Sequence, residues 1–157
     1  MAAPVINSGN PRPTRTLVVG LGNLLLRDDG VGVHAVRELR KVLPHRILAV
    51  DVGTAVLDAL HLFEWADRII AIDAMQAGGP PGTIYTFGVN DVEDQDATAS
   101  LHEMGLIAGL RFLKGPRPAI SMLAVEPESM DFGLELSDPV RAALPELVAS
   151  AKRMAES

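Results

Sequence analysis

The sequence predicts an α/β fold: a three-layer α/β/α sandwich around a mostly parallel, five-stranded sheet. Short apolar runs, typical of buried parallel strands, alternate along the chain with segments whose apolar residues recur at helical spacing. Such alternation is typical of a sheet whose successive strands are joined by helices on both faces. The chain has 157 residues, of which 48% are hydrophobic and 22% charged, so it is long enough for one domain with a sizeable core.

Four of the five predicted strands are short runs rich in Val, Ile, Leu or Ala. The first three are followed by Gly20, Asp51 and Asp73, residue types that favour turns. A connection rich in Gly and Pro, 78–82, precedes the fourth strand. The five predicted strands are 17–19, 47–50, 69–72, 83–87 and 119–125.

Four helices are predicted from apolar residues spaced three or four positions apart. Pro44 should end the first helix, and the third should span 101–113. The last should begin at Pro139, with Ser137 or Asp138 as its cap. The apolar residues that mark the first three helices are Val31, Ala35, Val36, Leu39 and Leu43; Val56, Leu57, Leu60 and Phe63; and Leu101, Met104, Ile107, Ala108 and Phe112.

The first segment, 1–16, is rich in Pro, Gly and Asn and lacks the continuous apolar run of a signal peptide. We therefore expect a flexible leader over 1–16 and a single α/β domain over 17–157. No stretch approaches the roughly 20 apolar residues of a membrane span, so we expect a cytoplasmic protein without a membrane partner. We also expect a monomer.

Composition excludes several classes of function. The formal net charge is −6, which disfavours binding to nucleic acid. The chain has no Cys, so disulfides, thiolate metal sites, iron–sulfur clusters and a Cys nucleophile are all excluded. Any metal must therefore be held by carboxylate, imidazole, carbonyl or water.

The turn after the first predicted strand, 20–32, begins like a dinucleotide-binding fingerprint but departs from it. Leu25 stands where the third Gly would be, and Asp28 and Asp29 lie ahead of the helix, where they would repel a pyrophosphate. No Gly-Lys-Ser/Thr sequence follows, so the turn is not a P-loop. We expect no nucleotide cofactor.

Carboxylates gather where the predicted strands end. Asp28 and Asp29 follow the first strand, while Asp51 and Asp73 close the second and third. Each alone could be a turn residue or a helix cap, but one Asp suffices to cap a helix and an adjacent second is surplus. Open α/β sheets bind ligands beyond the carboxyl ends of their strands. Carboxylates gathered there raise each other's pKa unless a cation lies between them, so this edge could hold a cation.

One of the four histidines is expected near the same edge. His102 lies at the start of the third predicted helix, where positive charge is disfavoured, so its imidazole should be neutral and able to bind metal. We interpret His34, His45 and His61 as surface residues. Two carboxylates and one imidazole with open positions suit a divalent cation such as Ni²⁺, Zn²⁺ or Fe²⁺.

Five segments together resemble the nickel–iron hydrogenase maturation proteases. They occur in one order from Leu17 to the last helix and so cover nearly the whole predicted domain. The segments are Gly-Leu-Gly-Asn-Leu-Leu-Leu-Arg-Asp-Asp-Gly-Val-Gly (20–32), Asp-Val-Gly-Thr (51–54), Ile-Asp-Ala (72–74), Ser-Leu-His-Glu-Met-Gly-Leu (100–106) and Glu-Pro-Glu-Ser (126–129).

The resemblance implies an endopeptidase that removes a C-terminal extension from a hydrogenase large-subunit precursor after nickel insertion. It implies that Asp29, Asp73 and His102 are both the catalytic and the metal-binding residues. It further suggests that Ni²⁺ arrives inside the precursor and is sensed there, with Zn²⁺ or Cd²⁺ as possible surrogates in the isolated protein. The sequence has no His-Glu-x-x-His motif and no Ser in a nucleophile elbow, and it leaves open whether catalysis is of the aspartic type or metal-assisted.

Two other classes use similar residues. A signalling receiver domain needs an acidic pair directly at the end of the first strand and a Lys after the last. Here the pair follows Val19 by nine or ten residues, and Glu126-Pro127 follows the last strand. A non-hydrolytic nickel metallochaperone is the second alternative, because a delivery site could use the same ligands. Only a protease would shorten the precursor.

Overall fold

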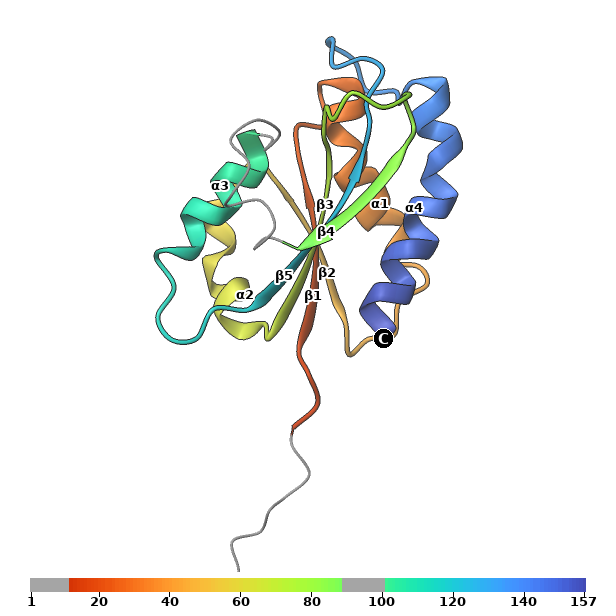
Figure 1. Ribbon diagram of the computed structural model, residues 1–157. Helices are drawn as coiled ribbons and strands as arrows, with labels where there is room; N and C mark the ends of the chain where they lie inside the picture. Colours follow the sequence, from red (N-terminus) through yellow and green to blue (C-terminus); the bar gives the residue numbers. More distant parts are fainter. Residues whose placement is uncertain (1–11, 89–100) are drawn as a thin grey trace, which may run out of the picture.

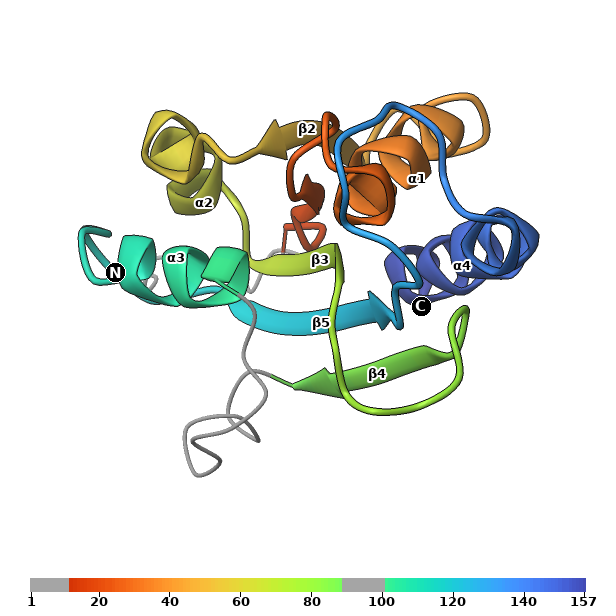
Figure 2. The ribbon, with the colours of Figure 1, turned by 90° about the horizontal axis from the view of Figure 1, so that it is seen from above.

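The computed structural model describes residues 12–88 and 101–157, and for 101–104 it describes the backbone alone. A five-stranded sheet forms the middle layer, in the order β2-β1-β3-β5-β4. Helices α1 and α4 cover one face, and α2 and α3 cover the other (Figure 1, Figure 2). The predicted α/β/α sandwich is confirmed. The strands are β1 (Thr16–Leu21), β2 (Leu48–Gly53), β3 (Arg68–Ala74), β4 (Ile84–Gly88) and β5 (Ala119–Val125). The α-helices are α1 (Val31–Leu39), α2 (Leu60–Trp65), α3 (Leu101–Leu110) and α4 (Asp138–Glu156), and two 3₁₀ helices are η1 (Arg27–Gly30) and η2 (Val56–Ala59).

The sheet is parallel except at one edge. β1 pairs in parallel with both β2 and β3, and β3 pairs in parallel with β5. β4 runs antiparallel to β5. The connection from β3 to β4 is a loop rather than a helix, which allows β4 to return antiparallel at the sheet edge.

The order of strands reverses direction between β1 and β3. From β1 the chain moves outward through α1 to β2, and it then returns past β1 through α2 to form β3 on the other side. The two connections lie on opposite faces of the sheet (Figure 2). Ligands of open α/β sheets bind at such a switch point, just beyond the carboxyl ends of the strands. The ends of β1 and β3 are therefore where a site is expected.

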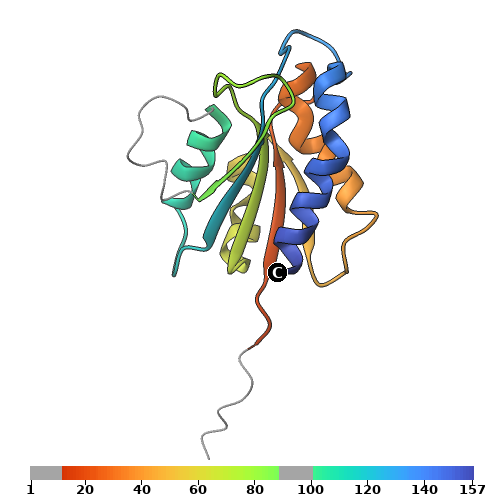
Figure 3. The same cartoon turned by 45° about the vertical axis from the view of Figure 1, so that its right-hand side comes forward.

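Two apolar clusters hold the layers together, one on each face of the sheet. One joins α1 and α4 to the sheet through buried residues such as Val36, Ile70 and Leu147. The other, around Phe63, Ile69 and Leu106, lies beneath α2 and α3. Figure 3 shows α1 and α4 side by side on their face. Because strand residues alternate between the two faces, Ile69 and Ile70 belong to different clusters.

The strand predictions were correct in number and order, but the two aspartates predicted to close the second and third strands lie inside those strands. Asp73 pairs with Ala124 in the β3–β5 ladder, and β3 continues to Ala74. Asp51 does not close the second strand: it pairs with Gly20 inside the β1–β2 ladder, and β2 continues to Gly53. Gly53 has a φ of +58°, which ends the extended backbone. For the fifth strand, 119–125, prediction and structure agree.

The first and third helices end earlier than predicted, and the backbone tightens where each of them ends. The first was expected to reach Leu43, but α1 ends at Leu39, after which the amide of Val42 bonds the carbonyl of Leu39. Such bonds to the third residue back replace the α-helical pattern at many helix ends. The third was expected to extend to residue 113 and ends at Leu110, where the amide of Phe112 bonds the carbonyl of Gly109. The second prediction, around Leu60, divides into η2 and α2.

Part of the expected leader is described. Residues 1–11 lie outside the described part of the chain. Arg12 and Arg15 both bind the carboxylate of Asp67, which immediately precedes β3. The Arg12 guanidinium and the backbone amide of Arg15 hold the pKa of Asp67 well below its usual range.

None of the helices in residues 12–88 and 101–157 is long and apolar enough to cross a membrane.

Candidate active site

The turn that carries the predicted acids is held tightly against the strand ends by glycines. A β-carbon at Gly20 would lie 2.3 Å from the carbonyl oxygen of Gly32, and one at Gly32 would lie 2.1 Å from the carbonyl oxygen of Ile72. Neither position has room for a side chain, so α1 begins in direct contact with β1 and β3. This packing places Asp28 and Asp29 over the carboxyl edge of the sheet.

Asp29 and Asp73 both border the short turn of Gly22 and Asn23 that follows β1. The Oδ2 atom of Asp29 accepts a hydrogen bond of 2.8 Å from the amide of Asn23. A β-carbon at Gly22 would lie 3.0 Å from Oδ1 of Asp73, and that oxygen also accepts a bond of 2.8 Å from the amide of Ala74. Both aspartates are buried, with 6% and 1% of their surface exposed. Two predicted site residues therefore border consecutive residues of one turn, at the switch point of the sheet.

The adjacent Asp28 has a different task. Its fully buried carboxylate accepts hydrogen bonds from the amides of Glu128, Ser129 and Ser137 and from the Ser137 hydroxyl, at 2.7–3.0 Å. Burial alone would raise the pKa of Asp28, but the hydrogen bonds from Ser129, Ser137 and Glu128 lower it below its ordinary value. Asp28 therefore anchors the loop between β5 and α4 as a buried anion.

This arrangement corrects the interpretation of the acidic pair. Asp28 is not a surplus helix cap, because its carboxylate reaches a segment about a hundred positions away in the sequence. Ser137 does precede α4 as predicted, but its hydroxyl donates to Asp28 rather than capping α4. Nothing local in the sequence encodes this contact, and a second acid beside Asp29 was the one signal available.

The third predicted ligand, His102, lies in the first turn of α3, and its side chain is outside the described residues. Among the side chains that are described, no group of three His, Asp or Glu residues is placed to hold a metal ion. The chemistry of the donor set fits a divalent cation, because Asp29 and Asp73 supply carboxylate oxygens and an imidazole would complete an open site. The assignment of Asp29, Asp73 and His102 thus stays a prediction.

Asp51 belongs to the neighbouring strand end and lies apart from the Asp29 and Asp73 pair. Its carboxylate is 3.8 Å from the guanidinium of Arg37 on α1. Asp51 lines a shallow hollow of about 190 Å³ between the ends of β1 and β2. The hollow is lined by Gly22, Asn23, Leu24, Val33, Asp51, Gly53 and Thr54. Because Gly22 and Asn23 also border Asp29 and Asp73, the hollow opens beside the candidate site.

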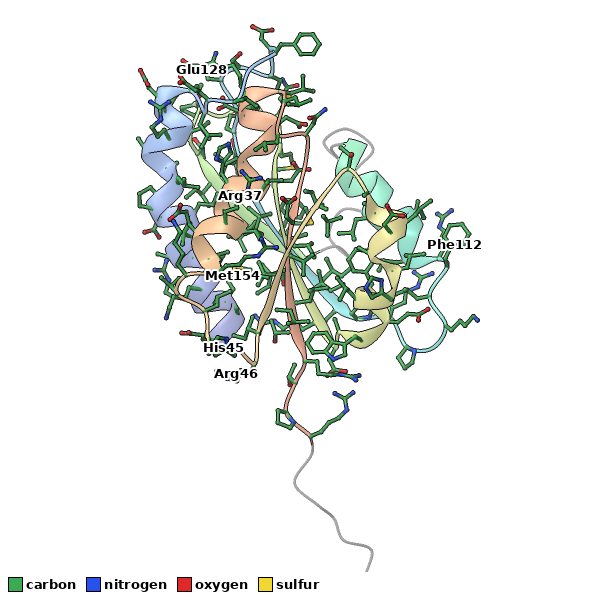
Figure 4. The ribbon with its side chains drawn as sticks, turned by 180° about the vertical axis from the view of Figure 1, so that it is seen from behind. Arg37, His45, Arg46, Phe112, Glu128 and Met154 are labelled. Atoms are coloured by element: carbon green, nitrogen blue, oxygen red, sulfur yellow. The ribbon has the colours of Figure 1, made fainter. Side chains whose placement is uncertain are left out.

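The structure corrects the interpretation of one other histidine. His45 and His61 are exposed, as predicted, and Figure 4 shows His45 at the opposite end of the molecule from Glu128. His34 is only partly exposed. Its pKa is lowered mainly by burial and also by the nearby charge of Arg37, and a hydrogen bond with the backbone of Leu134 partly offsets this shift. His34 is therefore part of the contact between α1 and the loop before α4.

Glu126 is a buried acid whose role the sequence did not indicate. Its carboxylate accepts hydrogen bonds from the amides of Ala77 and Gly78, at 2.7 and 3.0 Å, and from the hydroxyl of Tyr85 at 3.3 Å. Burial and the adjacent charge of Glu126 raise the pKa of Tyr85, so the phenol stays a donor. Glu126 follows β5 directly, so its position at a strand end was the available signal. It fixes the loop between β3 and β4 beside Asp73.

The comparisons with known proteins agree with this fold. The family model "Hydrogenase maturation protease" matches residues 33–154. The hydrogenase expression/formation protein HupD of Rhizobium leguminosarum bv. viciae is 31% identical, over 95% of this chain and 78% of that protein. The hydrogenase 2 maturation protease of Escherichia coli is also 31% identical, over 82% of each chain.

Solved structures give the same result. The NiFe hydrogenase maturation protease HybD from Thermococcus kodakarensis superimposes with a TM-score of 0.79 at 31% identity, over 90% of this chain and 99% of that one. The hydrogenase maturating endopeptidase HybD from Escherichia coli has a TM-score of 0.78 at 29% identity, over 88% and 90% of the two chains. Sequence, fold and relatives therefore agree, and this chain belongs to the hydrogenase maturation protease family as an endopeptidase.

Proposed function

We propose that this endopeptidase removes the C-terminal extension of a nickel–iron hydrogenase large-subunit precursor after nickel insertion, and that Asp29, Asp73 and His102 sense the precursor's nickel. The observation that carries the proposal is the burial of Asp29 and Asp73 against the same two-residue turn. Carboxylates gathered in a confined position are stabilised when a cation lies between them. A metal ion presented by the substrate would supply that cation.

Binding energy can control a reaction only when the correct substrate makes contacts that the incorrect one lacks. A nickel-loaded precursor offers a cation to two carboxylates and an imidazole, whereas an empty precursor offers none. Discrimination between the two precursors then needs no conformational switch in the protease. The nickel belongs to the substrate, where a metal ion of this kind can polarise a scissile carbonyl, and a carboxylate of the site would act as base toward water.

The test compares cleavage of nickel-loaded and empty precursor by chelator-treated protein, followed by mass spectrometry of the precursor. We expect the loaded precursor to be shortened and the empty one to stay intact. Asp29→Asn and Asp73→Asn should each abolish processing while the protein still folds, whereas Asp58→Asn, at an exposed position on η2, should process normally. Equal cutting of both precursors, or a need for metal added to the protease, would replace this proposal with a conventional metalloprotease.

The same experiment separates the protease from a non-hydrolytic metallochaperone. A chaperone would transfer nickel to an empty precursor and leave its mass unchanged apart from the metal. The relatives named above as proteases and endopeptidases favour hydrolysis.

A further inference from the structure

Three large apolar side chains are exposed close together beside the candidate site. Leu25, Phe132 and Leu134 have 57%, 89% and 61% of their surface exposed. The amide of Gly133, between the latter two, donates a hydrogen bond of 2.9 Å to the carbonyl of Leu25, so the two loops that carry them are in contact. Single exposed apolar residues are ordinary, but a group of them marks an interaction surface. We name Leu25, Phe132 and Leu134 the loop patch.

The backbone beneath the loop patch is held in place from several sides. The amide of Arg27 donates to the carbonyl of Gly133 at 2.9 Å, and its guanidinium donates to the carbonyl of Glu135. Arg27 has a φ of +45°, an unfavourable conformation that persists only where surrounding contacts impose it. Asp28 binds the loop at Ser129 and again at Ser137. The exposure of these apolar side chains is therefore a feature of a well-anchored loop.

The loop patch is surrounded mainly by negative charge. Segment 126–138 contains five acidic residues and no Lys or Arg. Four of the acids are exposed: Glu128, Asp131, Glu135 and Asp138. Two basic side chains, Arg27 and Arg141, contact the segment, and Arg141 already pairs with Glu135 and Asp138. An apolar centre within an acidic rim fits a protein surface with apolar side chains among Lys and Arg.

The loop patch is also continuous with the candidate site. Asp28, which anchors the loop, is adjacent in sequence to Asp29, and Leu25 follows the Gly22–Asn23 turn that both site aspartates border. A substrate that bound both the candidate site and this surface would therefore contact neighbouring segments of the chain. Among the described residues, a second exposed apolar area lies elsewhere: Leu57 and Phe112, 65% and 67% exposed, line a hollow of about 550 Å³ between η2 and α3.

We propose that the loop patch is the docking surface for the body of the hydrogenase precursor, through a face of that protein that combines apolar side chains with Lys and Arg. The proposal rests on the proposed function, because the precursor is the partner. It assigns the affinity for the precursor to Leu25, Phe132 and Leu134, and it assigns the recognition of nickel to the candidate site. Whole-protein docking then holds the scissile segment near Asp29 without requiring tight binding of that segment itself.

The test compares two double variants in binding to the intact precursor by biolayer interferometry and in cleavage kinetics. Phe132→Ser with Leu134→Ser removes two of the three apolar side chains of the loop patch, and Leu57→Ser with Phe112→Ser is the matched control on the other apolar area. We expect the first pair to weaken binding at least about tenfold and to raise KM with little change in kcat, and the control to stay within about twofold. Thermal melting should be nearly unchanged in both, because all four side chains are exposed.

A charge-reversal variant, Asp131→Lys with Glu135→Lys, should slow association at low salt, and the difference from the unmodified protein should shrink as salt is raised. Equal losses from the two double variants, or loss from the control alone, would overturn the proposal. The result is independent of nickel sensing, because the patch variant should weaken binding to nickel-loaded and empty precursors by the same factor. If both precursors were cut equally but the patch variant alone lost affinity, nickel sensing would fail and the docking surface would stand.

Discussion

The carboxylate of Asp28 accepts hydrogen bonds from both the amide and the hydroxyl of Ser137, at 2.8 and 2.7 Å, across 109 positions of the sequence. Ser137 is the residue before α4, so the first turn of the domain is tied to the start of its last helix. Asp29 is the next residue along the chain from Asp28. The geometry of the candidate site therefore depends on a contact with a part of the chain that supplies none of the predicted ligands.

Replacing Asp28 with Asn should destabilise the fold strongly. Asn keeps the shape of the side chain. Its NH₂ group, however, would face the amide and hydroxyl donors that bind carboxylate oxygens in the unmodified protein, so donor would meet donor. We expect a loss of about 2–4 kcal/mol in the free energy of unfolding, measured by urea denaturation. Asp58→Asn, at an exposed position, is the control for removing one charge and should cost less than about 0.5 kcal/mol. Similar losses in the two variants would show that the Asp28 contacts contribute little.

The stability conferred by Asp28 should depend on pH in a defined direction. Its pKa in the folded protein is lower than the ordinary value of 3.8, so the ionised form favours folding. This contribution is complete above pH 3.8 and is lost as the pH falls through the folded-state pKa. The difference in unfolding free energy between the unmodified protein and Asp28→Asn should therefore be constant near neutrality and shrink below about pH 4. A difference that grew on acidification would contradict the shift.

Gly22→Ala should damage both the fold and the activity. Gly22 has a φ of +107°, and a β-carbon there would lie 1.9 Å from the carbonyl oxygen of Asp29 and 3.0 Å from Oδ1 of Asp73. Gly115 is the matched control, because its φ is +100° and nothing lies within 4 Å of its β-carbon position. We expect Gly115→Ala to cost about 1 kcal/mol and Gly22→Ala at least about 3 kcal/mol, with loss of processing. Equal costs would mean that the turn relaxes away from the two aspartates.

The bonds that Glu126 accepts from two loop amides should contribute more to the free energy of unfolding than its bond with Tyr85. Glu126→Ala removes the acceptor for two loop amides and should cost about 1–2 kcal/mol, partly relieved by water because Ala77 and Gly78 are exposed. Tyr85→Phe removes the bond of 3.3 Å to Glu126, together with the contacts of the phenol with Gly79 and Thr83, and should cost about 0.5 kcal/mol. Chemical denaturation of both variants checks the order, and a larger effect from Tyr85→Phe would reverse the assignment.

Metal titration tests the predicted third ligand directly. The isolated protein should bind Ni²⁺, Zn²⁺ or Cd²⁺ modestly, because three ligands leave an open site that favours exchange. His102→Ala should weaken binding at least about tenfold in isothermal titration calorimetry. His61→Ala, at an exposed position on α2, is the control and should bind as the unmodified protein does. Equal weakening by both variants would remove His102 from the site.

Features of the fold that depend on residues close together in the sequence could be predicted from local patterns. The buried strands were found because continuous apolar runs such as 119–125 suit a parallel sheet covered on both faces. Asp73 was predicted because it is the first polar residue after such a run; it is buried and lies one residue before the end of β3. The sheet edge, and hence the approximate position of the site, could therefore be predicted from strand endings alone.

Features set by contacts distant in sequence could not be predicted in this way. The bonds of Asp28 to Ser137 and of Glu126 to Gly78 each join separate loops, so no local pattern distinguishes these acids from ordinary turn residues. Asp51 was misplaced because the ladder with β1, rather than its own polarity, decides where β2 ends. Phe112 was expected in the apolar stripe of a helix, but it is exposed because α3 ends two residues earlier.

The tie between Asp28 and Ser137 also has a consequence for the order of events during synthesis. A ribosome that has released β1, α1 and β3 has produced Asp29 and Asp73 but not yet the hydrogen-bond donors that satisfy the adjacent carboxylate of Asp28. An unsatisfied buried charge is too costly to keep, so the turn stays open until the segment before α4 emerges. A nascent chain would thus carry the two predicted site acids without their final geometry. We therefore expect peptide cleavage to begin only with the completed domain.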